Sequence, residues 1–230
     1  MSHRRPVRDE IEVRGGSRIL ALVAVEGPPG TGKTDLARAL ARRLNARCVL
    51  DRAAECPFLE DFQRDARRWA FKTQLFLILS RYLQQQELQQ GDLFHDLTVT
   101  DYLFERDRLY ATLTLDDREL ALYEKLAGLI ERDLPRPDRI IYLQAPATEL
   151  HYRLAARRGR GPGREYLSAL VEAYNYFLLH HRRSPVLVVD AARPVLWTGP
   201  RLERLVEDLR RPQTDLRYWN PSLESDPDRG

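Results

Sequence analysis

Apolar residues along the chain gather in short runs, which alternate with long segments of helical spacing. The first run, 19–25, is uninterrupted and stops at a glycine-rich loop, which is typical of a strand buried on both faces of a parallel sheet. Shorter β-prone runs return at 47–50, 97–100, 139–143 and 186–189. Because helix-like segments separate these runs, the pattern predicts an α/β fold with a five-stranded parallel sheet flanked by helices.

Helices are expected in the segments between these strands. Over 33–44 the apolar residues recur at helical spacing, and Asn45 follows as a stop signal. The segment 65–90 contains neither glycine nor proline and should form one long helix. Two further helices are expected at 116–133 and 164–181.

The same pattern divides the chain into regions. Residues 1–18 are arginine-rich with little apolar content and should form a flexible arm, whereas 19–211 should fold as one globular domain. Residues 159–163 hold three glycines and a proline, a composition suited to a mobile loop. From 212 to 230 the chain is mostly polar, and we expect a weakly ordered tail.

Composition narrows the class of protein. A chain of 230 residues, of which 43% are hydrophobic, is long enough for one domain with a sizeable core. A formal net charge of only +3 argues against a nucleic-acid-binding protein. No stretch reaches the roughly 18 apolar residues of a membrane span, and Cys48 and Cys56 match no zinc-binding pattern. We therefore expect a cytoplasmic protein that binds neither nucleic acid nor membrane.

A phosphate-binding loop follows the first apolar run. Residues 27–34 read G-x-x-x-x-G-K-T, a spacing that points successive backbone N–H groups into one concavity. Lys33 should contact the β- and γ-phosphates and Thr34 should give its hydroxyl to Mg²⁺, at the N-terminus of a helix whose dipole favours anions. The sequence thus predicts binding of a nucleoside triphosphate, with ATP as the default, and of Mg²⁺. The residues assigned to this binding are Gly27, Gly30, Thr31, Gly32, Lys33 and Thr34.

The loop alone does not separate kinases from switches and motors. A regulatory GTPase would need an N-K-x-D segment, which the chain lacks, and motor or helicase modules usually need a longer chain. A small-substrate kinase is favoured.

Five later segments carry a resemblance to a known family. They are D-R-A-A-E-C-P-F-L at 51–59, R-W-A-F-K-T-Q-L-F-L-I-L-S-R at 68–81, T-D-Y-L-F-E-R-D-R-L-Y at 100–110, P-R-P-D at 135–138 and R-G-R at 158–160. Together they resemble the deoxyribonucleoside kinases over roughly residues 19–190, with the bacterial deoxyadenosine/deoxyguanosine kinase branch the most similar. The resemblance implies an ATP-dependent kinase that phosphorylates the 5′-hydroxyl of a purine deoxyribonucleoside in nucleotide salvage. It also implies a homodimer joined through long helices.

The resemblance assigns catalytic and metal-binding roles. Asp51 stands where the family usually has a glutamate that accepts the proton of the 5′-hydroxyl, with Glu55 as a fallback. The alternative interpretation of Asp51 is a cap or surface carboxylate at the end of a strand. Asp101 would hold Mg²⁺ together with Thr34. Because Tyr102 follows Asp101 where other relatives have arginine, cations are expected from the glycine loop instead. There Arg158 and Arg160 resemble lid arginines, and Arg153 and Arg157 are possible substitutes.

The nucleoside pocket is assigned in the same way. Gln74, Arg81 and Asp107 align with the residues that read the base, and Gln74 and Arg81 lie two helical turns apart on one face. Phe71, Phe104 and Tyr110 either enclose the base or belong to the core. Gln63 replaces a tyrosine that contacts the sugar, and the lid is short, which leaves Glu165 as a possible replacement. Another P-loop nucleoside or nucleoside-monophosphate kinase, such as one similar to thymidylate kinase, and a nucleotide-binding protein without activity remain alternatives.

Overall fold

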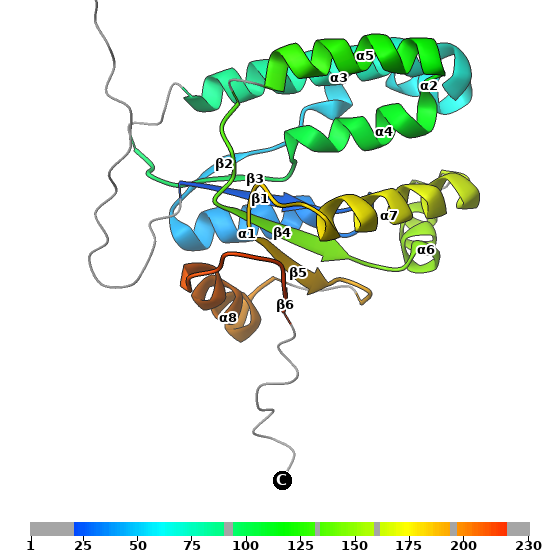
Figure 1. Ribbon diagram of the computed structural model, residues 1–230. Helices are drawn as coiled ribbons and strands as arrows, with labels where there is room; N and C mark the ends of the chain where they lie inside the picture. The colour runs from blue at the N-terminus through cyan, green and yellow to red at the C-terminus, as the bar shows by residue number, and fades with distance from the viewer. Residues whose placement is uncertain (1–20, 90–93, 132–133, 159–161, 194–196, 220–230) are drawn as a thin grey trace, which may run out of the picture.

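The computed structural model describes residues 21–89, 94–131, 134–158, 162–193 and 197–219, which form a parallel sheet between two layers of helices (Figure 1). The sheet has six strands in the order β2-β3-β1-β4-β5-β6. All neighbouring strands run parallel. The strands are β1 Leu22–Glu26, β2 Arg47–Val49, β3 Thr98–Thr100, β4 Arg139–Gln144, β5 Val186–Asp190 and β6 Arg217–Trp219.

The central strand β1 is buried on both faces, as its unbroken apolar run predicted. Val23 and Val25 point into one hydrophobic cluster, while Ala24 between them points into the other. Successive side chains of a strand face opposite sides, so each face of the sheet receives its own core. β4 repeats this alternation with Ile140 and Ile141.

Two layers of helices cover these faces. On one side lie α1 Lys33–Leu44 and α8 Gly199–Arg210, and on the other lie α4 Asp107–Thr114 and α7 Arg164–Leu179 (Figure 1). Beyond α4, a third hydrophobic cluster packs α3 Ala66–Gln89 against α5 Asp117–Ile130. The remaining elements are η1 Ala53–Glu55, α2 Leu59–Arg64, η2 Phe104–Arg106 and α6 Ala147–Arg158. Among the residues described, no helix combines the length and apolar character needed to cross a membrane.

The prediction of five strands was wrong by one. The sixth strand, β6, comes from the segment that was expected to be a weakly ordered tail, and it pairs with β5. Trp219 of this strand is buried beside Trp197, with ring centroids 6.4 Å apart. The buried Arg139 of β4 donates to the carbonyl oxygens of Arg211 and Gln213, so the chain leading to β6 is fixed to the domain. The arm 1–18 and residues 220–230 lie outside the described residues.

Candidate active site

The phosphate loop lies between β1 and α1, at the edge of the sheet where the parallel strands end. Gly27, Gly30 and Gly32 have φ of 151°, 89° and 91°, values that residues with a Cβ rarely adopt. A Cβ on Gly27 would also lie 2.5 Å from the carbonyl oxygen of Leu143 in β4. The Lys33 ammonium folds over the loop and donates to the Gly27 carbonyl oxygen at 2.7 Å. The structure therefore brings the loop glycines and Lys33 together at the N-terminus of α1, as the motif predicts.

Asp101, directly after β3, links this loop to the next strand. The Thr34 hydroxyl donates to Oδ2 of Asp101 at 2.5 Å, and the Asp51 backbone N–H donates to Oδ1 at 2.6 Å. A hydroxyl and a carboxylate side by side are the hard oxygen ligands that Mg²⁺ prefers. The donor set of Thr34 and Asp101 thus fits the predicted metal.

Asp51, after β2, lies between two buried guanidinium groups. Its Oδ2 accepts from Arg81 at 3.1 Å and from Arg106, and its Oδ1 accepts the Ala53 N–H at 3.1 Å. Burial favours the neutral acid, but the charges of Arg106 and Arg81 outweigh it and lower the pKa of Asp51 to about 2. Asp51 is therefore an ionised carboxylate that is only 15% exposed, and its bond to the Ala53 N–H is the local contact that a cap would make. The fallback Glu55 is exposed on η1.

Each of the two arginines also contacts a second carboxylate. Arg81 pairs with Asp107 of α4, and both side chains are only 2% exposed. Arg106 approaches Glu26, the last residue of β1, at 3.6 Å. Carboxylates and guanidiniums thus alternate in one buried row that runs Asp107, Arg81, Asp51, Arg106, Glu26.

The sequence analysis missed Arg106 and Glu26. An arginine was sought directly after Asp101, where Tyr102 stands, and the cation was then assigned to the glycine loop. Arg106 instead lies five residues after Asp101, and the turn η2 brings its side chain back to the site. The available signals were the Glu-Arg pair at 105–106 and a carboxylate immediately before the phosphate loop.

The predicted base-reading residues lie together on two packed helices. Gln74 and Arg81 are buried on one face of α3, as their spacing predicted. The Gln74 amide nitrogen donates to the Thr114 hydroxyl of α4 at 3.4 Å, two turns from the Arg81–Asp107 contact. Neither Oε1 of Gln74 nor Oδ2 of Asp107 accepts a hydrogen bond within the described part of the chain. These two buried oxygens remain available to a ligand.

The predicted aromatic and sugar-side residues are less closely gathered. Tyr110 packs edge to face on Tyr174 of α7, under the Arg106 guanidinium, whereas Phe104 belongs to the third hydrophobic cluster. Phe71 is partly buried on α3 and Gln63 is exposed on α2. No hydrogen bond within the described ranges joins either of these two to the Asp51 row.

The lid arginines are only partly described. Arg160 lies outside the described residues, as does the side chain of Arg158, the last residue of α6. Arg153 was a possible substitute, but its guanidinium donates to the carbonyl oxygens of Ala191 and Ala192 at 2.9 and 2.6 Å. It therefore ties α6 to the chain after β5. Arg157 and Glu165 are exposed.

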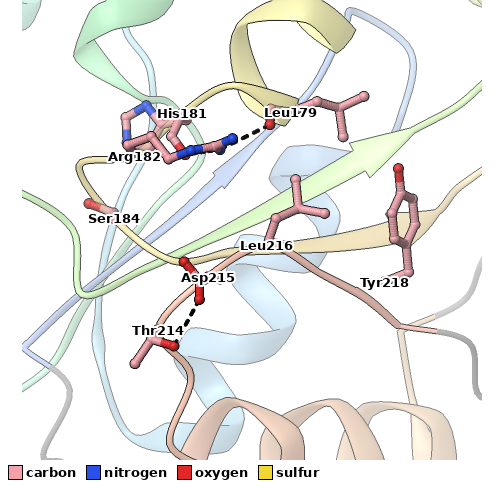
Figure 2. A pocket seen from close by; sticks show the side chains of 8 residues that line it. All are labelled: Leu179, His181, Arg182, Ser184, Thr214, Asp215, Leu216 and Tyr218. Atoms are coloured by element: carbon pink, nitrogen blue, oxygen red, sulfur yellow. Dashed lines mark hydrogen bonds between the residues drawn. The ribbon is translucent and has the colours of Figure 1, made fainter.

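A pocket lies elsewhere on the domain. It has a volume of about 470 Å³ and lies between the end of α7 and the chain that enters β6, where Leu179, Arg182, Asp215 and Tyr218 line it (Figure 2). These residues gather at the edge where β5 and β6 begin, opposite the phosphate loop. The pocket is therefore not part of the site described above.

Comparison with known proteins gives consistent results. The family model described as deoxynucleoside kinase matches residues 23–210. The chain is 31% identical to deoxyguanosine kinase of Bacillus subtilis (strain 168) over 157 residues, which cover 66% of this chain and 75% of that protein. It is 29% identical to deoxyadenosine kinase of Dictyostelium discoideum over 204 residues, which cover 86% of this chain and 81% of that protein.

A solved structure has the same fold. Deoxyadenosine kinase from M. mycoides with bound dATP matches with a TM-score of 0.71 and 21% identity, over 82% of this chain and 98% of that chain.

Proposed function

This chain belongs to the deoxynucleoside kinase family, and from that premise we propose that it transfers the γ-phosphate of ATP to the 5′-hydroxyl of deoxyadenosine or deoxyguanosine. Membership confirms the resemblance found in the sequence and makes the protein a kinase. The two relatives named above are a deoxyguanosine kinase and a deoxyadenosine kinase, which supports a purine nucleoside as the acceptor.

The observation that carries the proposal is the position of Asp51. Asp101 accepts from the Thr34 hydroxyl with one oxygen and from the Asp51 backbone N–H with the other, so one side chain joins Asp51 to the phosphate loop. At this position the Asp51 carboxylate can accept the proton of a hydroxyl that attacks the γ-phosphate. With a pKa of about 2 it is a weak base, but phosphoryl transfer depends mainly on alignment and charge neutralisation.

Cationic groups around Asp51 complete the proposed machinery. Lys33 and Arg106 supply positive charge near the transferred group, and Arg158 and Arg160 are proposed to close over the triphosphate. Mg²⁺, held by Thr34 and Asp101, would neutralise charge on the phosphates. Apart from the proton that Asp51 accepts, the protein then has only to hold these charges in place.

The acceptor base is assigned to Gln74, Arg81 and Asp107. A side-chain amide both donates and accepts, which suits the edge of adenine or guanine. The unpartnered oxygens of Gln74 and Asp107 support this assignment, because buried polar atoms normally have a hydrogen-bond partner. Phe71, Tyr110 and Gln63 are proposed to line the remainder of the nucleoside pocket.

A substrate panel tests the proposal. Purified protein with ATP and Mg²⁺ should phosphorylate deoxyadenosine or deoxyguanosine, measured by separation of the nucleoside and its monophosphate. Activity on nucleoside monophosphates alone would instead identify a monophosphate kinase, and ATP binding without any transfer would identify a non-enzyme.

One variant tests the base assignment. Asp51→Asn should lose turnover by at least about 100-fold while ATP binding, measured by calorimetry, survives. Glu55→Gln is the matched control, since Glu55 is exposed, and it should keep wild-type activity. Full activity of Asp51→Asn would refute the assignment.

We also propose a homodimer through α3 and α5. These neighbouring helices expose Leu79 and Leu83 on one and Leu122 and Leu129 on the other, and large exposed apolar side chains are common at interaction surfaces. Light scattering should give twice the chain mass, and Leu83→Glu should shift it toward the monomer, whereas Tyr218→Glu on β6 should not. A monomeric wild-type protein would contradict the proposal.

Location in the cytoplasm stays a prediction.

A further inference from the structure

Glu26 is a fully buried carboxylate at the point where β1 becomes the phosphate loop. Burying a carboxylate is costly unless hydrogen bonds and opposite charge compensate. Here Oε1 accepts the Gly27 N–H at 2.8 Å, and Oε2 accepts the Leu103 N–H at 2.7 Å. The Tyr174 hydroxyl donates to Oε1 at 3.3 Å, and Arg106 lies 3.6 Å from the same oxygen.

These partners come from different parts of the proposed active site. Gly27 opens the phosphate loop, whereas Leu103 begins the segment that carries Arg106 back to Asp51. Oε1 contacts Gly27 and Arg106, and Oε2 contacts Leu103. Glu26 therefore joins the phosphate loop to the acceptor side, as Asp101 does through Thr34 and Asp51.

We propose that Glu26 is a positioning residue that holds the phosphate loop in register with Arg106 and Asp51. The proposal deepens the kinase function proposed above and rests on it for the reaction, although not for the binding of ATP. Glu26 itself contacts neither reacting group in this scheme, because it acts through Gly27 and Arg106.

Both the shape and the charge of Glu26 matter for this role. A glutamine could turn its oxygen to Gly27, but its amide nitrogen would then face the Leu103 N–H, donor against donor. Its neutral amide would also leave Arg106 with Asp51 as its sole partner in the row. An aspartate would keep the charge but could not span both N–H groups.

Two substitutions remove either the charge or the length of Glu26. Glu26→Gln and Glu26→Asp should each lower kcat by about tenfold or more, with a much smaller change in the KM for ATP, because the phosphate loop is retained but no longer held in register with Arg106. Hydrogen exchange should also become faster at the Leu103 N–H, which loses its acceptor in both variants. Glu207→Gln, an exposed carboxylate on α8, is the matched control. The kcat, KM, Tm and exchange rates of the Gly27 and Leu103 N–H groups are measured for each.

The outcomes distinguish this proposal from the proposed function. If Glu26→Gln and Glu26→Asp lose only thermal stability and keep the wild-type kcat, Glu26 is structural and the proposal is overturned. If Glu26→Gln does not fold, Glu26→Asp still decides, since an unchanged kcat there overturns the proposal. If the wild type phosphorylates no nucleoside, the proposed function fails, while unchanged exchange of the Gly27 and Leu103 N–H groups in the variants would overturn the role of Glu26 by itself.

Discussion

The buried ion pairs of Asp51 predict a dependence of stability on pH that one substitution can isolate. The Arg106 and Arg81 charges, acting against burial, lower the pKa of Asp51 from an ordinary 3.8 to about 2. A carboxyl whose pKa is lower in the folded state stabilises the fold above its unfolded pKa, and that contribution is lost as pH falls through the folded pKa. A difference of this size corresponds to about 2 kcal/mol at pH 7, since Asp51 is only 15% exposed.

The assay is urea unfolding of the wild type and Asp51→Asn between pH 7 and pH 3. The free energy of unfolding of the wild type should exceed that of the variant at pH 7, and the excess should shrink by roughly 1 kcal/mol by pH 3. Carboxyls common to both proteins cancel in the difference. Glu207→Gln controls for loss of an exposed carboxylate. An excess that stays constant with pH would refute the inference that the two arginines hold Asp51 ionised.

Two further predictions concern glycine and a helix cap. Gly27→Ala should weaken ATP binding measured by calorimetry, because its Cβ would meet the Leu143 carbonyl oxygen, and an ATP affinity equal to that of the wild type would contradict this. A Cβ on Gly128 in α5 meets no atom within 4 Å, so Gly128→Ala should raise the free energy of unfolding by roughly 0.5–1 kcal/mol. Asp116→Ala should lower the free energy of unfolding by about 1 kcal/mol, because Asp116 and Glu119 form a capping box at the start of α5, and an unchanged denaturation midpoint would count against that cap.

The parts of the fold that local pattern determines were predictable. Helix α1 spans the expected residues and ends at Asn45, which has a φ of 50°. Asparagine adopts this left-handed backbone conformation more readily than most residues, and the conformation ends the helix. The strand before the phosphate loop was predictable for a similar reason. Its consecutive residues Val23, Ala24 and Val25 are all apolar, as a strand with hydrophobic clusters on both faces requires.

β6 could not be predicted in this way. It is three residues long and begins with Arg217, so neither length nor alternation marks it as a strand. What holds it is pairing with β5 and the contact of Trp219 with Trp197, and both partners are distant in sequence. Such an edge strand depends on tertiary contacts, which a local pattern does not report.

The site shows the same division. The phosphate loop and the spacing of Gln74 and Arg81 are local, and the structure places them as expected. Arg106 reaches Asp51 only because η2 turns the chain after β3, and nothing in the order of residues 100–110 requires that turn. Glu26 was not singled out in the sequence, and the structure buries it completely.

The row of alternating charges from Asp107 to Glu26 explains how the site can have Tyr102 after Asp101, where an arginine was sought. Arg106 contributes the same kind of charge from another position and is held by two carboxylates, Asp51 and Glu26. Arg81 is likewise shared between Asp51 and Asp107, so Asp51 connects the proposed base-reading end to the phosphate end. Each guanidinium interacts with two carboxylates, so removing the charge of one carboxylate strengthens the interaction of that arginine with the other. A substitution at Asp107 or at Glu26 should thus change the pKa of Asp51, although neither residue contacts Asp51 directly.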